Sequence, residues 1–305
     1  MTNYKYTYSL VIPVYNSAGT LPKLVEEVKK NISDSFQIIF INDYSLDDSW
    51  KVLVELKKEN ENITIVNLVN NVGQHIAIFC GLMYAEGKYI ISLDDDLQHH
   101  PKEIQKLKDK AEEDDADVVY GIYEVKKHNI VRNSGSKVFA SIVNKFASTP
   151  LQGSSFKLIK KEVIDKVIQH NHFNFYLDEV LAWHSKQTSF VKIQHYKREV
   201  GASGYTPQKL MRMSLHVLFN YTAFPLKVIT NLGIISSLFS FGFGIYYIYE
   251  KINNFAQSGF TALIVSIFFS TGLILFSIGI IGEYIGRIFL IQSGKPPFKI
   301  KEVIR

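Results

Sequence analysis

The sequence predicts an α/β fold with a Rossmann-like, mostly parallel sheet, followed by an amphipathic helix and a two-helix transmembrane hairpin. Three observations predict this class. Short apolar runs alternate with segments of helical periodicity through the first two-thirds of the chain, as in βαβ units. Polar side chains repeatedly follow the apolar runs. Residues 229–249 and 260–282 carry no charge, and about 20 apolar residues suffice to span a bilayer.

The expected elements follow in a regular order. Strands are expected at residues 9–16, 36–41, 63–68, 89–93, 117–121, 153–159 and 190–196. Helices are expected at residues 21–31, 137–147 and 161–168. Three more are expected: one that begins after Asp47 or Asp48, one that ends at Ala85 and one that begins at Pro101. The strands of such βαβ units run parallel with right-handed crossovers, so their carboxyl ends lie at one edge of the sheet. Residues that follow the strands should therefore meet there.

Composition narrows the class of protein. The chain of 305 residues has room for one sizeable domain and an appendage. The formal net charge is +5 and the basic residues form no block, so we expect no nucleic-acid partner. Cys80 is the only cysteine, which excludes a disulfide framework and a thiolate metal site. The first nine residues lack the apolar core of a signal peptide, so the first two-thirds of the chain should stay in the cytoplasm.

The stretch from Ile90 to Gln98 is the most informative, because an apolar run ends in Asp94-Asp95-Asp96. Ligands of open parallel sheets bind beyond the carboxyl ends of the strands. Three neighbouring carboxylates repel one another unless a cation balances their charge. Asp94 and Asp96 stand at alternate positions and can converge on a hard divalent ion, to which Gln98 adds a neutral oxygen. The alternative is an acidic corner that is merely solvated.

The C-terminal third predicts attachment to a membrane. In residues 207–228, charged or polar side chains recur three or four apart between apolar ones, which predicts an amphipathic juxtamembrane helix that lies on a membrane or packs on the sheet. Residues 229–249 and 260–282 are expected to span the bilayer. Basic residues flank both ends of this hairpin, so the positive-inside rule places domain 1–206 and tail 283–305 in the cytoplasm.

These motifs resemble family 2 glycosyltransferases of the GT-A fold over nearly the whole chain. The match is closest to polyisoprenyl-phosphate glycosyltransferases, such as dolichyl-phosphate mannose synthase and the bacterial undecaprenyl-phosphate sugar transferases. Residues 11–16 resemble the family's opening strand, residues 71–75 the Asn-aromatic-Gly-Gln-His loop of the aminoarabinose-type transferases, residues 93–98 its Leu-Asp-x-Asp-Leu-Gln metal motif, and residues 282–287 its juxtamembrane sequence.

The resemblance implies a hexosyltransferase-type activity. An inverting, metal-dependent enzyme would transfer a sugar from a nucleotide-sugar donor to a polyisoprenyl phosphate, with undecaprenyl phosphate as the first choice. It would act at the cytoplasmic face of the cell membrane and supply a lipid-linked sugar for cell-surface glycans. Mg²⁺ or Mn²⁺ would be the cofactor, and the sequence leaves homo-oligomerisation open.

The resemblance also implies roles for individual residues. Metal ligands would be Asp94, Asp96 and Gln98. Donor contacts would come from Pro13, Tyr15, Asn16, Asp43, Asn71, Gln74, Asp94 and Asp95. The acceptor phosphate would be held by Arg132, Ser136, Arg198 and Ser203, and the catalytic residues would be Asp96, Arg132 and Arg198. Arginine suits phosphate because its planar fork binds it bidentately.

The chain departs from the family pattern at several positions, and one of these departures supports an alternative enzyme. The family usually has Glu at Ser17, Asp at Asn42, Gly at Tyr44, Arg at Lys157 and Lys at Gly204. Asp178 and Glu179 stand where close relatives tend to be neutral. A sugar hydroxyl acceptor needs a general base, whereas an ionised phosphate does not. Transfer to a hydroxyl of a lipid-linked glycan, with Asp178 or Glu179 as base, is therefore the alternative, and an exposed pair of charges at a helix start is the structural explanation.

A third hypothesis is a membrane carrier or a non-catalytic nucleotide-binding partner. Two spans without an intramembrane charge are too few for a usual translocation pathway. The complete acidic motif at residues 94–98 favours an enzyme.

Overall fold

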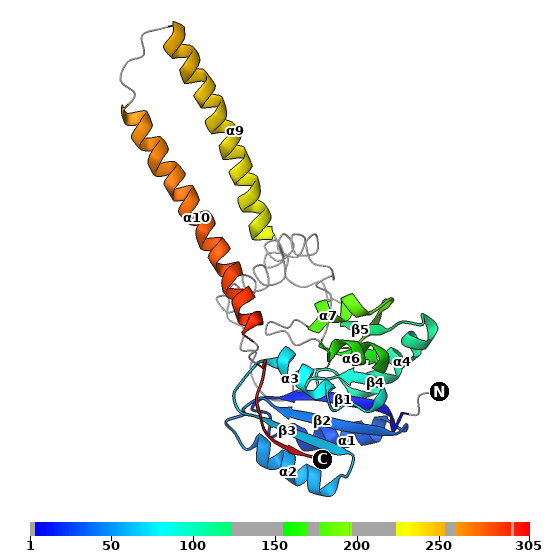
Figure 1. The fold of residues 1–305 in the computed structure, drawn as a ribbon. Helices are drawn as coiled ribbons and strands as arrows, with labels where there is room; N and C mark the ends of the chain where they lie inside the picture. The colour runs from blue at the N-terminus through cyan, green and yellow to red at the C-terminus, as the bar shows by residue number, and fades with distance from the viewer. Residues whose placement is uncertain are drawn as a thin grey trace. The chain divides into compact units, whose positions relative to one another are not determined.

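One mixed sheet organises the first part of the protein (Figure 1). The structure, a computed structural model, describes residues 4–123, 155–169, 177–194, 196, 224–253, 260–293 and 296–305. Contacts divide the chain into two units, residues 1–204 with 296–305, and residues 205–295. The helix expected at 137–147 and nearly all of the amphipathic helix expected at 207–228 lie outside the described residues.

Within the described residues the strand order is β7-β5-β6-β4-β1-β2-β3-β8. The strands are β1 (Tyr6–Val14), β2 (Phe36–Asn42), β3 (Ile63–Leu68), β4 (Gly87–Ser92), β5 (Val118–Tyr123), β6 (Lys157–Lys160), β7 (Thr188–Ile193) and β8 (Ile300–Ile304). Strands β1 to β4 pair in parallel, as do β5 and β7, whereas β6 and β8 are antiparallel to their neighbours. The predicted α/β sheet is confirmed, and its mixed character comes from β6 and β8.

Helices cover both faces of this sheet. They are α1 (Leu21–Asn31), α2 (Ser49–Glu59), α3 (Gln74–Leu82), the short η1 (Pro101–Glu103), α4 (Ile104–Glu113), α6 (Lys161–Val167) and α7 (Leu177–His184). Along β1, Leu10 and Ile12 belong to the core cluster that contains residues of α1, α2 and α4, whereas Val11 belongs to the cluster that contains residues of α3, α6 and α7. In Figure 1, α1 and α2 lie on one side of the sheet and α3 on the other. Because successive strand residues point to opposite faces, a central strand buried on both faces reads as a continuous apolar run.

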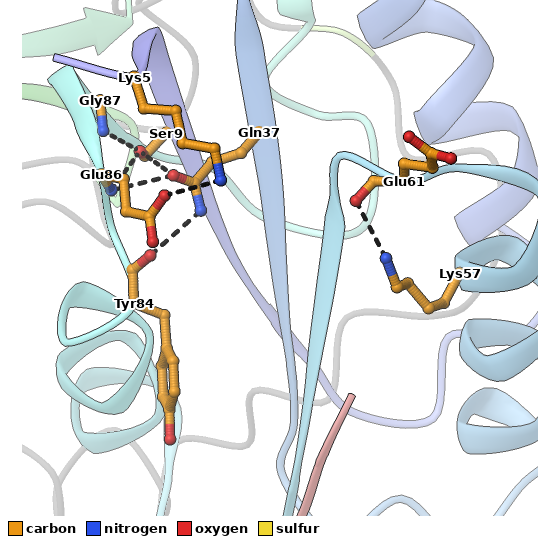
Figure 2. Close-up of polar contacts among 8 residues, drawn as sticks. All are labelled: Lys5, Ser9, Gln37, Lys57, Glu61, Tyr84, Glu86 and Gly87. Carbon is orange, nitrogen blue, oxygen red and sulfur yellow. Dashed lines mark hydrogen bonds and ion pairs between the residues drawn. The ribbon is translucent and has the colours of Figure 1, made fainter. Parts of the chain in front are cut away.

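A buried polar network fixes the turn between α3 and β4 (Figure 2). Gln37 accepts hydrogen bonds from the Ser9 hydroxyl (3.1 Å) and from the Glu86 amide (2.9 Å), and it donates to the Tyr84 carbonyl (3.1 Å). The Gly87 amide donates to Ser9 Oγ (2.7 Å). A Cβ at Gly87 would lie 2.7 Å from the Ser9 backbone nitrogen, so the close approach requires glycine.

The C-terminal residues, which were predicted to be a cytoplasmic tail, include a strand of the sheet. Residues 300–304 form β8, which pairs with β3 and is itself the edge strand of the sheet, and the Lys299 carbonyl accepts a hydrogen bond from the Val69 amide (2.9 Å). Phe298 packs edge-on against Phe79 of α3, with ring centroids 6.4 Å apart. The Arg305 guanidinium lies 5.1 Å from the centroid of the Tyr84 ring. The tail thus completes the sheet and contacts Phe79 within α3 and Tyr84 just after it.

The second unit contains two long helices that contact each other, α9 (Phe224–Asn253) and α10 (Phe260–Gln292). They include the two predicted spans, and α10 continues well past residue 282. By length and composition, one helix in the described part of the chain could cross a membrane, with its apolar window at Phe269–Gly286.

Candidate active site

The candidate site lies beyond the carboxyl ends of β1 to β4. The chain runs from β1 through β2 to β3 on one side of β1, whereas β4 pairs with the other side of β1. The strand order therefore reverses between β1 and β4, and open α/β sheets bind ligands at such a switch point. Tyr15 and Asn16 follow β1 and the acidic corner Asp94–Asp96 follows β4, so both predicted segments lie at the switch point.

Asp94 is held by three side chains. The Gln74 amide donates to Oδ1 (2.6 Å), the Ser155 hydroxyl donates to Oδ2 (2.5 Å), and the His99 Nδ1 lies 3.3 Å from Oδ2. Burial alone would raise the pKa of Asp94, but the contacts with His99 and Ser155 and the nearby Lys157 ammonium outweigh burial and hold the pKa below its ordinary value. Asp94 is thus an ionised carboxylate with a fixed orientation.

Asp95 ties the acidic corner to the loop after β1. Its Oδ2 accepts the Tyr15 amide (3.2 Å), and its backbone carbonyl accepts the Thr20 hydroxyl (2.8 Å). Burial raises the pKa of Asp95 to about 6, and the neighbouring charges of Asp94 and Asp96 add to the rise. The hydrogen bond with Tyr15 directs the side chain of Asp95 back toward the loop after β1.

The loops after β1 and β2 are joined through Asn16. Its backbone amide donates to Ser45 Oγ (3.0 Å), and its side-chain Oδ1 accepts the Leu46 amide (2.8 Å). Asn16 and Tyr44 both have left-handed backbones, with φ of 53° and 57°, and asparagine tolerates this region better than most residues. The side chains of Tyr15 and Tyr44 remain about half exposed, at 50% and 49%. Pro13, another predicted donor contact, is half-buried within β1.

Asp43 holds the loop after β3 instead of presenting a free carboxylate. It is buried, and its two oxygens accept the backbone amides of Val72 (2.7 Å) and Gly73 (2.9 Å), while the Asn71 side chain donates to the Asp43 carbonyl (3.0 Å). Burial raises the pKa of Asp43, and the two amides oppose the rise. Gly73 has a φ of 86°, so glycine lets the loop turn into α3 and present Gln74 to Asp94.

A buried ion pair lies behind Asp94. The Lys157 ammonium contacts the Asp178 carboxylate, which also accepts the Tyr120 hydroxyl (3.0 Å), and Lys157 and Asp178 are only 1% and 5% exposed. The interpretation of Asp178 as an exposed helix-start charge is therefore wrong, because a carboxylate in the core is retained when a cation and a hydroxyl compensate it. Burial lowers the pKa of the nearby His75, which favours a neutral imidazole.

Two contacts of the acidic corner were not predicted from sequence. Ser155 bonds Asp94, and the His99 ring stacks on Phe156 with centroids 5.3 Å apart. His99 directly follows Gln98, which is the only local signal. Ser155 comes from a segment 61 positions away, and only the antiparallel pairing of β6 with β4 brings it to the corner.

The donor set of the proposed metal site is made of oxygens. Asp96 Oδ1 accepts the Gln98 backbone amide (3.0 Å), which closes the turn after Asp94. In the part of the chain that the structure describes, no group of three or more His, Cys, Asp or Glu side chains is placed to hold a metal ion. Mg²⁺ is often bound by one or two carboxylates together with substrate phosphates, and carboxylates also suit Mn²⁺. The two carboxylates fit such a shared site.

The structure brings together the predicted donor residues of all four loops. The predicted acceptor residues Arg132, Ser136, Arg198 and Ser203 lie outside the described residues, as does the side chain of Glu179.

Comparisons with known proteins give the family of the chain. Residues 9–183 match glycosyl transferase family 2, and residues 224–288 match the GtrB C-terminal hairpin. An uncharacterised glycosyltransferase of Synechocystis sp. is 31% identical over 302 residues, covering 97% of this chain and 95% of the relative. The undecaprenyl-phosphate 4-deoxy-4-formamido-L-arabinose transferase of Klebsiella pneumoniae is 28% identical over 306 residues, covering 97% and 93%.

Among solved structures, a mannosyltransferase of Pyrobaculum calidifontis in complex with GDP-Man and Mn²⁺ is similar, with 11% identity and a TM-score of 0.48 over 96% of this chain and 89% of that chain. The family match spans more than half of the sequence and the first relative nearly all of it. The chain therefore belongs to glycosyl transferase family 2, and the protein is a glycosyltransferase.

Proposed function

We propose that this glycosyltransferase transfers a sugar from a nucleotide-sugar donor to a polyisoprenyl phosphate, with undecaprenyl phosphate as the acceptor to test first. The full-length likeness to the Klebsiella transferase, whose name states that acceptor, supports the proposal. The match to a C-terminal hairpin and the apolar window of α10 support a membrane location. We place the catalytic domain and both termini on the cytoplasmic side, with spans at 229–249 and 260–282, because basic residues flank the hairpin. The product would supply cell-surface glycan modification.

In this proposal the four loops bind the donor. Gln74, Ser155 and His99 fix the carboxylate of Asp94, and the Tyr15 amide fixes that of Asp95. Mg²⁺ or Mn²⁺ bound by Asp94 and Asp96 would neutralise charge that develops on the departing diphosphate. Asp43 acts by shaping the loop that carries Asn71 and Gln74.

The observation that favours the phosphate acceptor is the environment of Asp178. A general base for a sugar hydroxyl must reach the hydroxyl proton, within about 2.6–3.2 Å. Asp178 is buried and already contacts Lys157 and Tyr120, so it is poorly placed for that task. A lipid phosphate is ionised near neutral pH and can attack without deprotonation, opposite the leaving nucleotide, which inverts the anomeric centre. Arg132 with Ser136, and Arg198 with Ser203, are proposed to hold that phosphate.

A transfer assay with the full chain in detergent tests the proposal. UDP-, GDP- and dTDP-sugars would be offered with undecaprenyl phosphate and Mg²⁺ or Mn²⁺, and the lipid-soluble product would be measured. We expect one donor to yield a sugar-phosphate lipid, with most activity lost in EDTA or in Asp96→Asn. Arg198→Ala should lose about a hundredfold in rate, because a charge-assisted contact to phosphate contributes a few kcal/mol. Arg198→Lys should recover only part of this loss.

Matched variants make the result decisive. Arg305→Ala removes the arginine that follows β8 and should keep near-normal activity. Sugar transfer only to a hydroxyl acceptor, abolished by Glu179→Gln while Arg198→Ala stays active, would establish the alternative enzyme. Full activity in EDTA together with full activity of Asp96→Asn would contradict the metal site.

A further inference from the structure

The chain leaving β7 is attached to the loop that follows the acidic corner. The Tyr196 amide donates a hydrogen bond to the Gln98 carbonyl (3.3 Å). The Tyr196 ring packs against the His100 imidazole, with centroids 5.1 Å apart, and the Lys102 ammonium lies 4.6 Å from the centroid of the Tyr196 ring. Backbone and side chain of Tyr196 thus contact one short loop, which begins at the proposed metal ligand Gln98.

His100 is itself held in one orientation. Its Nδ1 accepts the Lys102 amide (3.3 Å), and its Nε2 lies 3.2 Å from the Glu27 carboxylate of α1. The Asn31 side chain donates to the same carboxylate oxygen (3.0 Å). An Nδ1 that accepts and an Nε2 that donates define one tautomer and fix the ring plane. Tyr196 therefore packs on a surface anchored to α1 as well as to the acidic corner.

These contacts add little to the stability of the fold. Lys102 and Tyr196 are not in the core, and the His100 side chain is 21% exposed. Solvent-exposed cation-π contacts and ion pairs are individually weak. Their effect is mainly geometric, because they fix where the chain departs from β7, two residues before Arg198. Two residues of extended chain span at most about 7 Å.

We propose that Tyr196 and His100 are positioning residues that align the acceptor-binding segment with the acidic corner. This inference rests on the proposed function, in which Arg198 binds the acceptor phosphate. Tyr196 would act on the acceptor through the chain that follows it, whereas the donor is bound by the loops after β1 to β4. Disturbing Tyr196 should therefore weaken the acceptor and leave the donor unaffected.

The test measures KM for undecaprenyl phosphate and KM for the donor separately, with the full chain in detergent. Tyr196→Ala should raise the acceptor KM about tenfold and leave the donor KM within twofold. Tyr196→Phe keeps the ring contacts with His100 and Lys102 and should restore the acceptor KM. Tyr6→Ala is the matched control. The Lys5 ammonium lies 5.2 Å from the centroid of the Tyr6 ring, and Tyr6 is at the start of β1, whereas the candidate site lies beyond its end.

The outcomes separate the two proposals. An unchanged acceptor KM in Tyr196→Ala, or an equal rise in the donor KM, overturns the positioning role while wild-type transfer to the lipid phosphate upholds the function. A wild-type enzyme that uses no polyisoprenyl phosphate overturns the proposed function and this inference with it. If Tyr196→Ala does not fold, as judged by thermal unfolding, His100→Gln takes its place. It should raise the acceptor KM selectively, and an unchanged value would count against the inference.

Discussion

Lys157 and Asp178 depend on each other at the scale of single residues, because both are in the core. Lys157→Met would leave the Asp178 carboxylate buried without its cation, which typically costs about 3–5 kcal/mol. For a protein of this size each kcal/mol lowers Tm by roughly 2–4 °C, so thermal unfolding in detergent should show a fall of about 10 °C.

Lys160→Met is the control for this prediction. Lys160 lies on the same strand, but its nearer partner Asp115 is 96% exposed and its second partner Asp117 lies 3.7 Å away, and surface pairs contribute about 0–1 kcal/mol. The double variant Lys157→Met/Asp178→Leu should recover much of the lost Tm, because an apolar pair of similar volume needs no compensation. Equal losses in Lys157→Met and Lys160→Met would show that the buried pair has no special weight.

At the scale of elements, the network around Gln37 fixes how α3 joins β4 (Figure 2). Gln37→Ala should destabilise the protein by about 1–3 kcal/mol, because the part-buried Tyr84 carbonyl loses its partner and the Glu86 amide keeps only its longer bond to Ser9 Oγ (3.2 Å). Hydrogen exchange should show faster exchange at the Glu86 and Gly87 amides. Gln105→Ala is the control, since Gln105 bonds Asp109 on the exposed face of α4. Unchanged exchange at Glu86 in Gln37→Ala would contradict the role of the network.

Local patterns predicted most elements, and long-range pairing explains those that they did not. Leu21, Leu24, Val25 and Val28 repeat at helical spacing and are all buried in α1, as predicted. Strand β8 was not predicted, because Ile300–Ile304 becomes a strand only by pairing with β3, far away in the sequence. Helix α7 was predicted only as the helix start in the structural explanation of Asp178 and Glu179. That explanation made Asp178 a surface charge, because its partner Lys157 lies 21 positions earlier in the sequence.

In the candidate site, too, local patterns predicted some features and long-range contacts explain the rest. The acidic corner and the loops after β1, β2 and β3 could be predicted from their positions after strands, and the structure brings them together. The sequence could not show that both carboxylate oxygens of Asp43 accept hydrogen bonds from backbone amides, or that the Ser155 hydroxyl bonds Asp94. These contacts depend on loop conformation and on antiparallel pairing, which periodicity does not encode.

At the scale of the whole molecule, the proposed two-span topology makes a labelling prediction. A cysteine placed at Asn254, which lies outside the described residues, should react with a membrane-impermeant maleimide on intact cells. Cys80 would first be replaced by serine, although burial raises the pKa of its thiol to about 12. A cysteine at the exposed Lys58 on α2 is the control and should react only after permeabilisation. The reverse labelling pattern would contradict the topology.

Strand β8 also limits how many times this chain can cross a bilayer. The residues that follow the hairpin are hydrogen-bonded to β3, so the chain leaves the sheet after β7 and returns to it at β8. Because the sheet lies on one side of the membrane, the chain between β7 and β8 must cross the bilayer an even number of times. If α10 crossed alone, residues 300–304 would be separated from β3 by the whole thickness of the membrane. Any crossing by α10 therefore requires a second segment that crosses in the opposite direction.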